Sequence, residues 1–341
     1  MIDAGQDSQR YPAGAMTTPG GQPTCVSVVM PVLNEERHLR EAVARVLEQD
    51  LDGDLELVLA LGPSTDRTDA VAGELAAADP RVRLVRNPSG STPRALNAAV
   101  AASSHPVIAR VGGRAVLPAH YLRTALALLE QTGADNVGGI MDAQGLTHVE
   151  RAVAAAMRSR LGVGSAPFHT GGEAGPAETV YLGVFRRSAL DRVGGYDEHF
   201  ARAQDWEMNH RIRSSGGTVW FTPELRVTYR PRADLRALAR QYFQYGRWRR
   251  AVARHHPGTM SARYLAPPAL TVALLGSVLI SPWLPLAVLL AAGYLGALVV
   301  GSLLIEPGLP WRSRALLPPV LAVMHLSWGV GFLTSRVEGP A

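Results

Sequence analysis

The chain has 341 residues, enough for one large domain with an appendage or for two modest domains. Apolar residues make up 47% of the chain and charged residues only 18%, an apolar composition for a soluble enzyme. The formal net charge is +5. The single cysteine, Cys25, excludes an intramolecular disulfide and indicates a reducing compartment.

Residues 1–24 lack the charged start and apolar core of a signal peptide, and their composition predicts a disordered tail. From residue 25 onwards, apolar runs of strand type alternate with helical patterns. Strands are predicted at 26–30, 55–61, 82–85, 107–111 and 136–141, and helices at 35–48, 66–78, 93–102 and 121–131. This alternation predicts an α/β domain with a parallel sheet covered on both faces, which binds ligands at the carboxyl ends of its strands.

Polar side chains follow the first three predicted strands. They are Pro31, Asn34 and Glu35 after the first strand, Ser64 and Asp66 after the second, and Arg94 and Asn97 after the third. No glycine-rich phosphate loop is present, which disfavours a dinucleotide-binding fold. A strand-to-helix turn explains Asn34 and Glu35 equally well, and a solvated arginine explains Arg94 equally well. For Ser64 and Asp66, capping of the following helix is the favoured explanation. The glycine-bearing loop before Arg94 can also hold a diphosphate.

The segment 162–178 is rich in glycine, which predicts a loop without regular structure, of a length typical of a lid or an acceptor loop. Farther along, Asp205 and Trp206 stand at the expected start of a helix. A catalytic carboxylate in this place, shortly before the apolar end of the chain, favours chemistry on a substrate presented at a membrane surface. The alternative for Trp206 is a place in the core.

Residues 226–263 contain ten arginines and one acid, Asp234. Apolar residues at positions 235, 238, 242, 245 and 252 have helical spacing, which predicts basic amphipathic helices lying on anionic lipid. Nucleic acid is the rival partner for so many arginines. The neighbouring apolar runs favour lipid headgroups or a diphosphate instead, so no nucleic-acid partner is expected.

The last part of the chain, residues 264–341, is predicted to be a transmembrane region of two or three helices. Its runs 265–280, 284–305 and 315–333 contain no Asp, Glu, Lys or Arg. The second run has about 22 residues and would extend roughly 33 Å as a helix, enough for a bilayer core. The first is shorter, so it spans by borrowing residues 281–283 or is re-entrant. The basic segment before these runs predicts a multi-pass protein of the cell membrane with a cytoplasmic globular part. The alternative is a set of buried helices in a soluble core.

Six motifs, taken in chain order, resemble those of family 2 glycosyltransferases. They lie at 26–35, 64–68, 94–97, 194–198, 204–207 and 244–248. The nearest likeness is to membrane-bound enzymes of the succinoglycan glucosyltransferase type, over residues 25–255. The resemblance implies a GT-A fold over 25–225, that is, a Rossmann-like nucleotide-diphospho-sugar transferase domain. It also implies a nucleotide-sugar donor, usually a UDP-sugar, inversion at the anomeric carbon, and a lipid-linked or polysaccharide acceptor in envelope or exopolysaccharide synthesis.

The same resemblance implies a role for each matching residue. Asp205 is the catalytic base, and Trp206 is a wall for the acceptor sugar. Nucleotide-sugar contacts come from Pro31, Asn34, Glu35, Ser64, Asp66, Arg94, Asn97, Arg110, Gly112 and Arg114. Acceptor and diphosphate contacts come from Gln244, Arg247 and Trp248 of the Gln-x-x-Arg-Trp motif.

The chain departs from the family pattern at two strand ends. Leu61 and Gly62 replace an acidic pair, and Gly112-Gly113-Arg114 replaces the usual Asp-x-Asp or Asp-x-His. Glycine has no side chain and arginine has no lone pair for a cation, so the usual two-point metal clamp cannot be built. The residues therefore name no metal ligands and leave a requirement for a divalent cation, Mg²⁺ or Mn²⁺, undecided. Our hypothesis is that Arg114, with Arg94 and Arg247, supplies fixed positive charge instead.

These departures define the alternative function. A catalytically weak relative would bind nucleotide sugar or scaffold a glycan-assembly complex. The retained Asp205 favours an enzyme, whereas the missing acids favour a scaffold.

Overall fold

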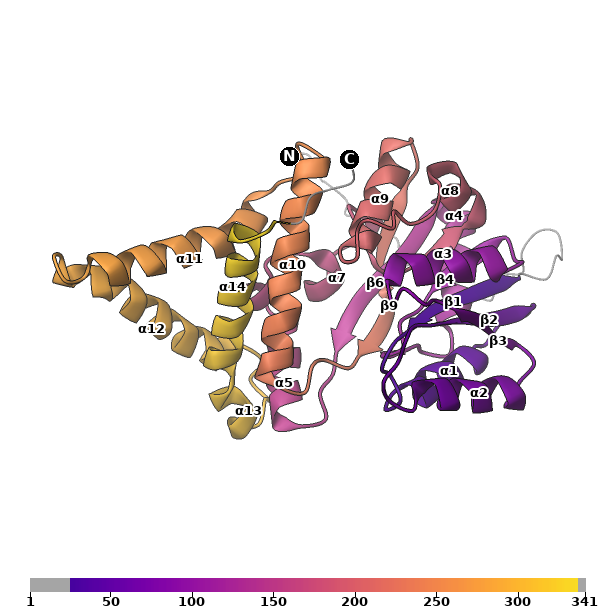
Figure 1. Ribbon diagram of the computed structural model, residues 1–341, viewed down its shortest axis with the longest axis horizontal. Coiled ribbons are helices and arrows are strands. Elements are labelled where there is room, and N and C mark those ends of the chain that lie inside the picture. The colour runs from indigo at the N-terminus through magenta and orange to yellow at the C-terminus, as the bar shows by residue number, and fades with distance from the viewer. Residues whose placement is uncertain (1–24, 337–341) are drawn as a thin grey trace, which may run out of the picture.

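The computed structural model describes residues 25–336, so the tail predicted at 1–24 lies outside the described residues. The described chain forms one α/β domain from which two long helices project (Figure 1). The strands are β1 (Val26–Val32), β2 (Leu55–Leu61), β3 (Val82–Arg86), β4 (Val107–Arg110), β5 (Ala115–Val116), β6 (Asn136–Ala143), β7 (Gly175–Pro176), β8 (Tyr181–Arg186) and β9 (Val219–Tyr229). The last strand extends the domain four residues beyond its predicted end at 225.

The helices alternate with these strands and then continue alone. They are α1 (Leu39–Leu47), α2 (Thr68–Ala78), α3 (Thr92–Ala102), α4 (Tyr121–Thr132), α5 (His148–Met157), α6 (Arg160–Val163), α7 (Pro167–Thr170), α8 (Arg187–Val193), α9 (Gln204–Ser214), α10 (Leu235–His255), α11 (Ala262–Ile280), α12 (Val288–Leu304), α13 (Trp311–Ala315) and α14 (Leu317–Leu333). The segment 162–178 thus contains two short helical turns and a short strand, so the prediction of no regular structure there is wrong. Its glycines end these turns, since Gly164 and Gly171 have φ of 72° and 81°.

The sheet has the order β3-β2-β1-β4-β8-β6-β9-β5, with β7 on β9. Strands β1 to β4 are parallel, as predicted, but β8 runs antiparallel to both β4 and β6. The prediction of a fully parallel sheet is therefore wrong beyond β4. Strand β8 begins with Tyr181 beside Gly139 of β6 and reaches Asn136 with Phe185, so it runs back along β6.

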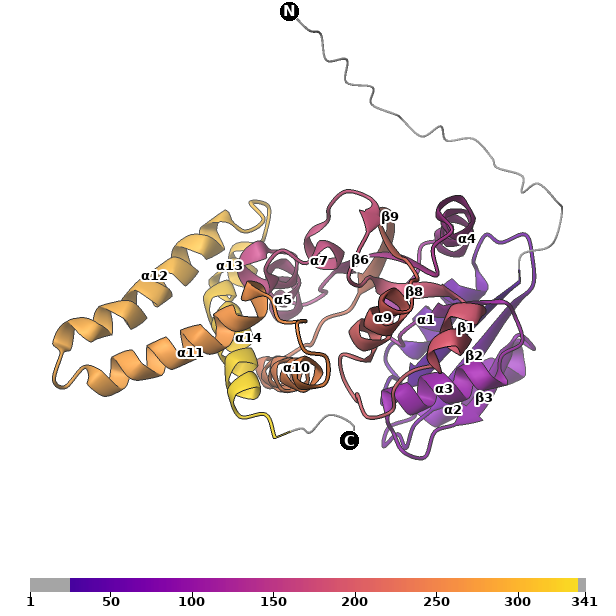
Figure 2. The same cartoon turned by 90° about the horizontal axis from the view of Figure 1, so that it is seen from above.

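Three helices of the described chain are long and apolar enough to cross a membrane: Ala262–Ile280, Pro285–Leu304 and Trp311–Leu333. The first gains its length on the N-terminal side, where it begins at Ala262 and includes Pro267 and Pro268, and not by borrowing 281–283. Helices α11 and α12 project from the molecule as a hairpin (Figures 1 and 2). Helix α14 instead lies beside α10.

The apolar stripe of α10 was expected to face lipid, and here the structure differs. Leu238 and Tyr242 are buried in one apolar cluster with Leu317, Val320 and Leu321 of α14. Helix α14 therefore covers this part of the stripe, whereas Tyr245 remains 40% exposed. The arginines of α10 lie around this contact.

Close approach of α10 and α14 depends on glycine. A Cβ atom at Gly246 would lie 2.0 Å from the carbonyl oxygen of Trp328. Gly246→Ala is therefore expected to force the helices apart and to lower the free energy of unfolding by about 1–3 kcal/mol, despite the better helix propensity of alanine. Thermal unfolding of the detergent-solubilised protein measures this. The matched control is Gly276→Ala on α11, where no atom lies within 4 Å of the added carbon. A Gly246→Ala protein as stable as wild type would contradict this packing.

At the opposite edge of the sheet from the strand carboxyl ends, Glu56 ties the first strands together. Its carboxylate accepts hydrogen bonds from the Ser27 hydroxyl (2.6 Å) and from the Ser104 N–H (2.6 Å) and hydroxyl (2.9 Å). Burial alone would raise the pKa of Glu56, but these bonds lower it from 4.5 to about 2. Because the folded pKa lies below the unfolded one, the stabilisation is present above pH 4.5 and is lost as pH falls toward 2.

Glu56→Gln is accordingly expected to flatten the acid dependence of stability. Between pH 4.5 and 2 the wild type should lose about 3 kcal/mol more unfolding free energy than the variant. Chemical denaturation at a series of pH values measures the difference. Glu130→Gln, at an exposed position on α4, is the control and should leave the wild-type pH profile unchanged. Parallel profiles for wild type and Glu56→Gln would contradict the assignment.

Candidate functional site

The loops after β1 and β2 are bound to each other at the carboxyl edge of the sheet. Asn34 has a positive φ of 54°, which turns the chain before α1 and delays the helix to Leu39. The Asn34 N–H donates to the Ser64 hydroxyl (3.1 Å), and the Asn34 side-chain oxygen accepts from the Thr65 N–H (2.8 Å). Ser64 therefore does not cap α2 as predicted. Asp66 does, because its carboxylate accepts from the Thr68 N–H (3.0 Å).

Arg114 and Glu35 form an ion pair beside these loops. The Arg114 Nε lies 2.9 Å from Glu35 Oε1, and the two side chains are 23% and 15% exposed. The other oxygen of Glu35 is buried without a hydrogen-bond partner. Burial raises the pKa of Glu35 above its usual range, although the Arg114 guanidinium opposes this. Both residues line a cavity of about 230 Å³ together with Asn34, Asp66 and Arg232. An arginine thus stands at the wall of the cavity where a metal ligand was expected.

Gly112 leaves open space next to Arg110. The nearest atom to a Cβ added at Gly112 is an Arg110 guanidinium nitrogen at 4.0 Å, and the backbone there has no positive φ. No steric requirement for glycine exists at this position, so the missing acid is a chemical difference and not a packing necessity.

The side chains at this edge do not fit a divalent metal. Among the described residues no group of three or more His, Cys, Asp or Glu side chains comes together to hold an ion. Of the nearby acids, Asp66 already accepts from the Thr68 and Glu36 N–H groups, and Glu35 pairs with Arg114. Arg114 also adds positive charge where a cation would sit. No step of the reaction is therefore derived through a metal.

Asp205 lies at the same edge, in the first turn of α9. The helix is entered through Ala203, which has a positive φ of 62°, and its N-terminus favours a negative charge. The Asp205 carboxylate lies 3.3 Å from the Arg110 guanidinium at the end of β4. Arg110 is 13% exposed and Asp205 is 37% exposed, so the carboxylate is held by a buried cation yet remains open to solvent. The sequence places Arg110 among the donor contacts, whereas the structure places its guanidinium against Asp205.

Helix α3 holds the loop that leads to α9. The Asn97 side chain accepts from the Tyr196 N–H (2.8 Å) and donates to the Tyr196 carbonyl (2.8 Å). Arg94 Nε pairs with Glu198 at 3.0 Å. The amide of Asn97 is thus engaged within the protein, and it positions the loop instead of reaching the cavity. Arg94 is more than half exposed, and its contact with the sugar donor stays a prediction.

A buried arginine that the sequence reasoning missed joins α9 to the first projecting helix. The Arg249 guanidinium lies 4.3 Å from the ring centre of Trp206 and 4.0 Å from that of Tyr264, and the residue is 5% exposed. Stacking between two aromatic faces stabilises such a desolvated cation. The signal in the sequence is the arginine directly after the Gln-x-x-Arg-Trp motif. The partly exposed Trp206 thus stacks on Arg249 in the first turn of α9, and its role as a wall for the acceptor sugar stays a prediction.

The remaining predicted residues make other contacts. Trp248 packs near Phe200, with ring centres 6.3 Å apart, and Arg247 lies 5.8 Å over the ring of Phe243. Within the described chain no hydrogen bond or ion pair joins the side chains of Gln244, Arg247 or Trp248 to Asp205, Arg110 or Arg114. Their roles in acceptor or diphosphate binding stay predictions, as does that of the half-buried Pro31 in β1.

Comparison of the sequence with known proteins gives a consistent result. The model of the family described as Glycosyl transferase family 2 matches residues 27–194. The chain is 32% identical over 313 residues to the succinoglycan biosynthesis protein ExoA of Rhizobium meliloti (strain 1021), which covers 89% of this chain and 93% of that relative. It is 27% identical over 113 residues to the uncharacterized glycosyltransferase EpsJ of Bacillus subtilis (strain 168), which covers 33% of each.

Solved structures share the fold at low sequence identity. The mannosyltransferase PcManGT from Pyrobaculum calidifontis, in complex with GDP-Man and Mn²⁺, gives a TM-score of 0.62 at 20% identity and covers 93% of this chain and 89% of that chain. S. aureus TarS 1–349 in complex with UDP-GlcNAc gives a TM-score of 0.50 at 16% identity and covers 91% of both chains. The predicted GT-A fold is confirmed.

Proposed function

The chain belongs to glycosyl transferase family 2, and from that premise we propose that it is an inverting glycosyltransferase acting at the cytoplasmic face of the membrane. It moves a hexose from a nucleotide sugar, with a UDP-sugar as the first choice, to a lipid-linked or polysaccharide acceptor. The name of the ExoA relative supports a role in exopolysaccharide synthesis. The complexes of PcManGT with GDP-Man and of TarS with UDP-GlcNAc support a nucleotide-sugar donor.

The observation that carries the proposal is the pairing of Asp205 with Arg110 at the carboxyl edge of the sheet. The Arg110 guanidinium lies 3.3 Å from the carboxylate of Asp205, and 37% exposure leaves this carboxylate open to an incoming hydroxyl. In the reaction Asp205 accepts the proton of the acceptor hydroxyl. The hydroxyl oxygen forms a bond to the anomeric carbon as the bond from that carbon to the diphosphate breaks, and attack from the opposite face inverts the configuration.

The departing diphosphate gains negative charge, which a fixed cation stabilises. Arg114 lines the cavity beside Asn34 and Asp66 and is the cation best placed for this role. The exposed Arg94, in the motif at 94–97, is a second candidate. The PcManGT complex contains Mn²⁺, which makes a divalent cation plausible for the fold. In this chain the expected ligand positions hold Gly112 and Arg114, so we propose that turnover does not require the ion.

A panel of UDP-, GDP- and dTDP-sugars tests the proposal on the full chain in lipid nanodiscs, with lipid-linked acceptors from the same membrane. The readout is release of nucleoside diphosphate together with sugar transfer to the acceptor. One donor is expected to support turnover, and the product should have the inverted configuration. Measurable donor binding without turnover across the whole panel would instead support the scaffold alternative, which the missing acids at 61, 62 and 112 favour.

A further inference from the structure

We propose that, of the helices in residues 25–336, only α11 and α12 cross the bilayer, and that α14 lies along the membrane surface between this hairpin and the catalytic domain. The C-terminal end of α14 would then be on the same side of the membrane as the catalytic domain. By length and apolar composition α14 could span a membrane as well as the other two helices can. The three helices differ in what they contact.

Helix α14 is packed lengthwise against α10, and the two run in the same direction (Figure 1). Near one end, Leu238 lies in a buried cluster with Leu317 and Val320. Farther along, a Cβ atom at Gly331 would lie 2.1 Å from the carbonyl oxygen of Phe243. The two helices are therefore one unit, and the placement of α14 relative to the membrane fixes the placement of α10.

Helix α10 cannot cross the hydrocarbon of a bilayer. It carries arginines from its first turn to its last, at Arg236, Arg240, Arg247, Arg249, Arg250 and Arg254. Charged side chains distributed along a crossing helix are strongly unfavourable in lipid, and anionic headgroups at the surface suit them instead. Because α14 follows α10, it does not cross either.

The exposure of the apolar side chains separates the three helices in the same way. Leu279 of α11 is 71% exposed and Leu304 of α12 is 77% exposed, so the described chain does not cover these parts of the hairpin, although Leu298 of α12 is buried against α14. Leu317, Val320 and Leu321 of α14 are fully buried against α10 and α5. Burial in lipid is therefore needed only for the hairpin.

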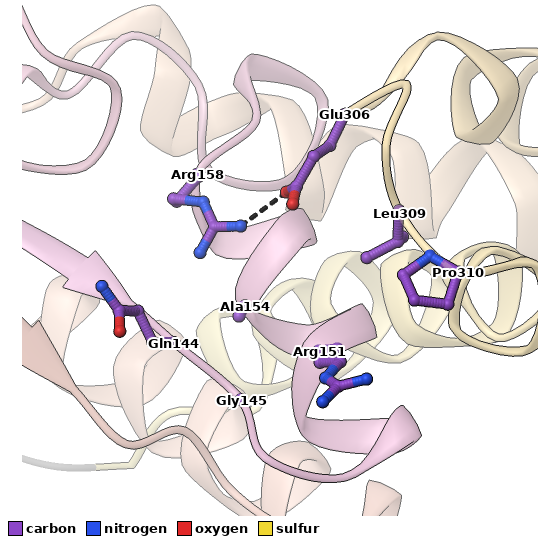
Figure 3. A pocket seen from close by; sticks show the side chains of 8 residues that line it. All are labelled: Gln144, Gly145, Arg151, Ala154, Arg158, Glu306, Leu309 and Pro310. Carbon is purple, nitrogen blue, oxygen red and sulfur yellow. Dashed lines mark hydrogen bonds and ion pairs between the residues drawn. The ribbon is translucent and has the colours of Figure 1, made fainter.

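Both ends of the hairpin are attached to the catalytic domain. Arg263 in the first turn of α11 pairs with Glu178 at 2.8 Å. Just after α12, Glu306 pairs at 2.5 Å with Arg158, the residue that follows α5. The pair borders a cavity of about 310 Å³ that is lined by Leu309, Pro310 and residues of α5 (Figure 3). Two helices that start and end at the same domain must return to the same side of a bilayer.

The tryptophans of this region mark the two membrane boundaries. Trp283, in the turn between α11 and α12, is 83% exposed, and Trp311, shortly after α12, is 74% exposed. Tryptophan is enriched at both interfaces of a bilayer. Helix α11 has 19 residues, and α12 together with the 3-10 turn at Pro285–Ala287 before it has 20. At 1.5 Å per residue each is about 30 Å long, close to the thickness of the hydrocarbon core.

Single-cysteine labelling of the full chain tests the arrangement. In a Cys25→Ser background, cysteine is placed in the catalytic domain (Asp52→Cys), in the hairpin turn (Ser281→Cys) and after α14 (Thr334→Cys). Each variant is treated with a membrane-impermeant maleimide in intact and in permeabilised cells. We expect the sites at 52 and 334 to react on one side of the membrane and the site at 281 on the other.

Two results would overturn the proposal. Reaction of the sites at 281 and 334 on the same side would show that α14 crosses. Reaction of all three sites on one side would show that the hairpin does not cross. As a second measurement, reporters fused after the last residue should give a fluorescent GFP and an inactive alkaline phosphatase if the catalytic domain is cytoplasmic. An active phosphatase, together with labelling of the site at 52 only after permeabilisation, would contradict the proposal.

Discussion

Replacement of Asp205 by asparagine is expected to lower kcat by about 10²–10⁴-fold and to leave donor binding close to that of the wild type. Asparagine keeps the shape of aspartate and retains an oxygen that can accept from Arg110, which lies 3.3 Å from the native carboxylate. It loses the basic oxygen that takes the acceptor proton. Initial rates of nucleoside diphosphate release, with donor affinity measured separately by calorimetry, separate the two effects.

The control for this variant is Asp191→Asn, which makes the same change of charge at an exposed position of α8. It should turn over at the wild-type rate. Because Arg110 loses its charged partner in the Asp205 variant, thermal unfolding must confirm that the protein remains folded. A folded Asp205→Asn protein that retains the wild-type rate would remove Asp205 from the reaction.

Arg114→Ala is expected to lower kcat by about 10²–10³-fold, the range found when one fixed donor to a developing negative charge is removed. The side chain lines the cavity, and Gly112 offers no acid that could recruit a substitute cation. Added Mn²⁺ is therefore not expected to restore the rate. Arg114→Lys keeps the charge but loses the fork of donors, so it should lie between the wild type and alanine. The measurement is again nucleoside diphosphate release at saturating donor.

Loss of Arg114 also leaves Glu35 without its partner, and that effect must be separated from the first. Glu35 is 15% exposed, and one of its oxygens already lacks a hydrogen bond. The matched control is the double variant Glu35→Gln and Arg114→Ala, which removes the unpaired charge. If the double variant recovered the wild-type rate, Arg114 would act only by neutralising Glu35. If Arg114→Ala alone were harmless, the fixed-cation account would be wrong.

The elements that the sequence predicted well are those with a strong local pattern. The buried strands β1 and β2 are continuous apolar runs, and they lie where the runs do, at Val26–Val32 and Leu55–Leu61. Helix α1 begins four residues later than predicted, at Leu39. The positive φ of Asn34 and its hydrogen bond to Ser64 hold the chain before the helix in a turn. The antiparallel direction of β8 has no local signal, since it depends on the path of the chain between β6 and β8.

The same division holds for the site. The position of Asp205 in the first turn of a helix follows from the residues around it, and the structure has it there. Its contact with Arg110 joins positions far apart in the chain and requires the fold. The clamp of Arg249 between Trp206 and Tyr264 brings three helices together and could not be predicted from spacing within any one of them. The contact of α14 with α10 likewise could not be predicted, because the composition of α14 is that of a candidate membrane span.

We propose that sugar transfer in this protein uses Asp205 as the base and a fixed arginine, without the metal ion that the PcManGT complex contains. The most direct test is the rate of nucleoside diphosphate release by the purified wild-type protein in excess EDTA, compared with the rate in Mn²⁺ or Mg²⁺. The account predicts equal rates, each abolished by Asp205→Asn. No release in EDTA, with full recovery on addition of the metal, would contradict it.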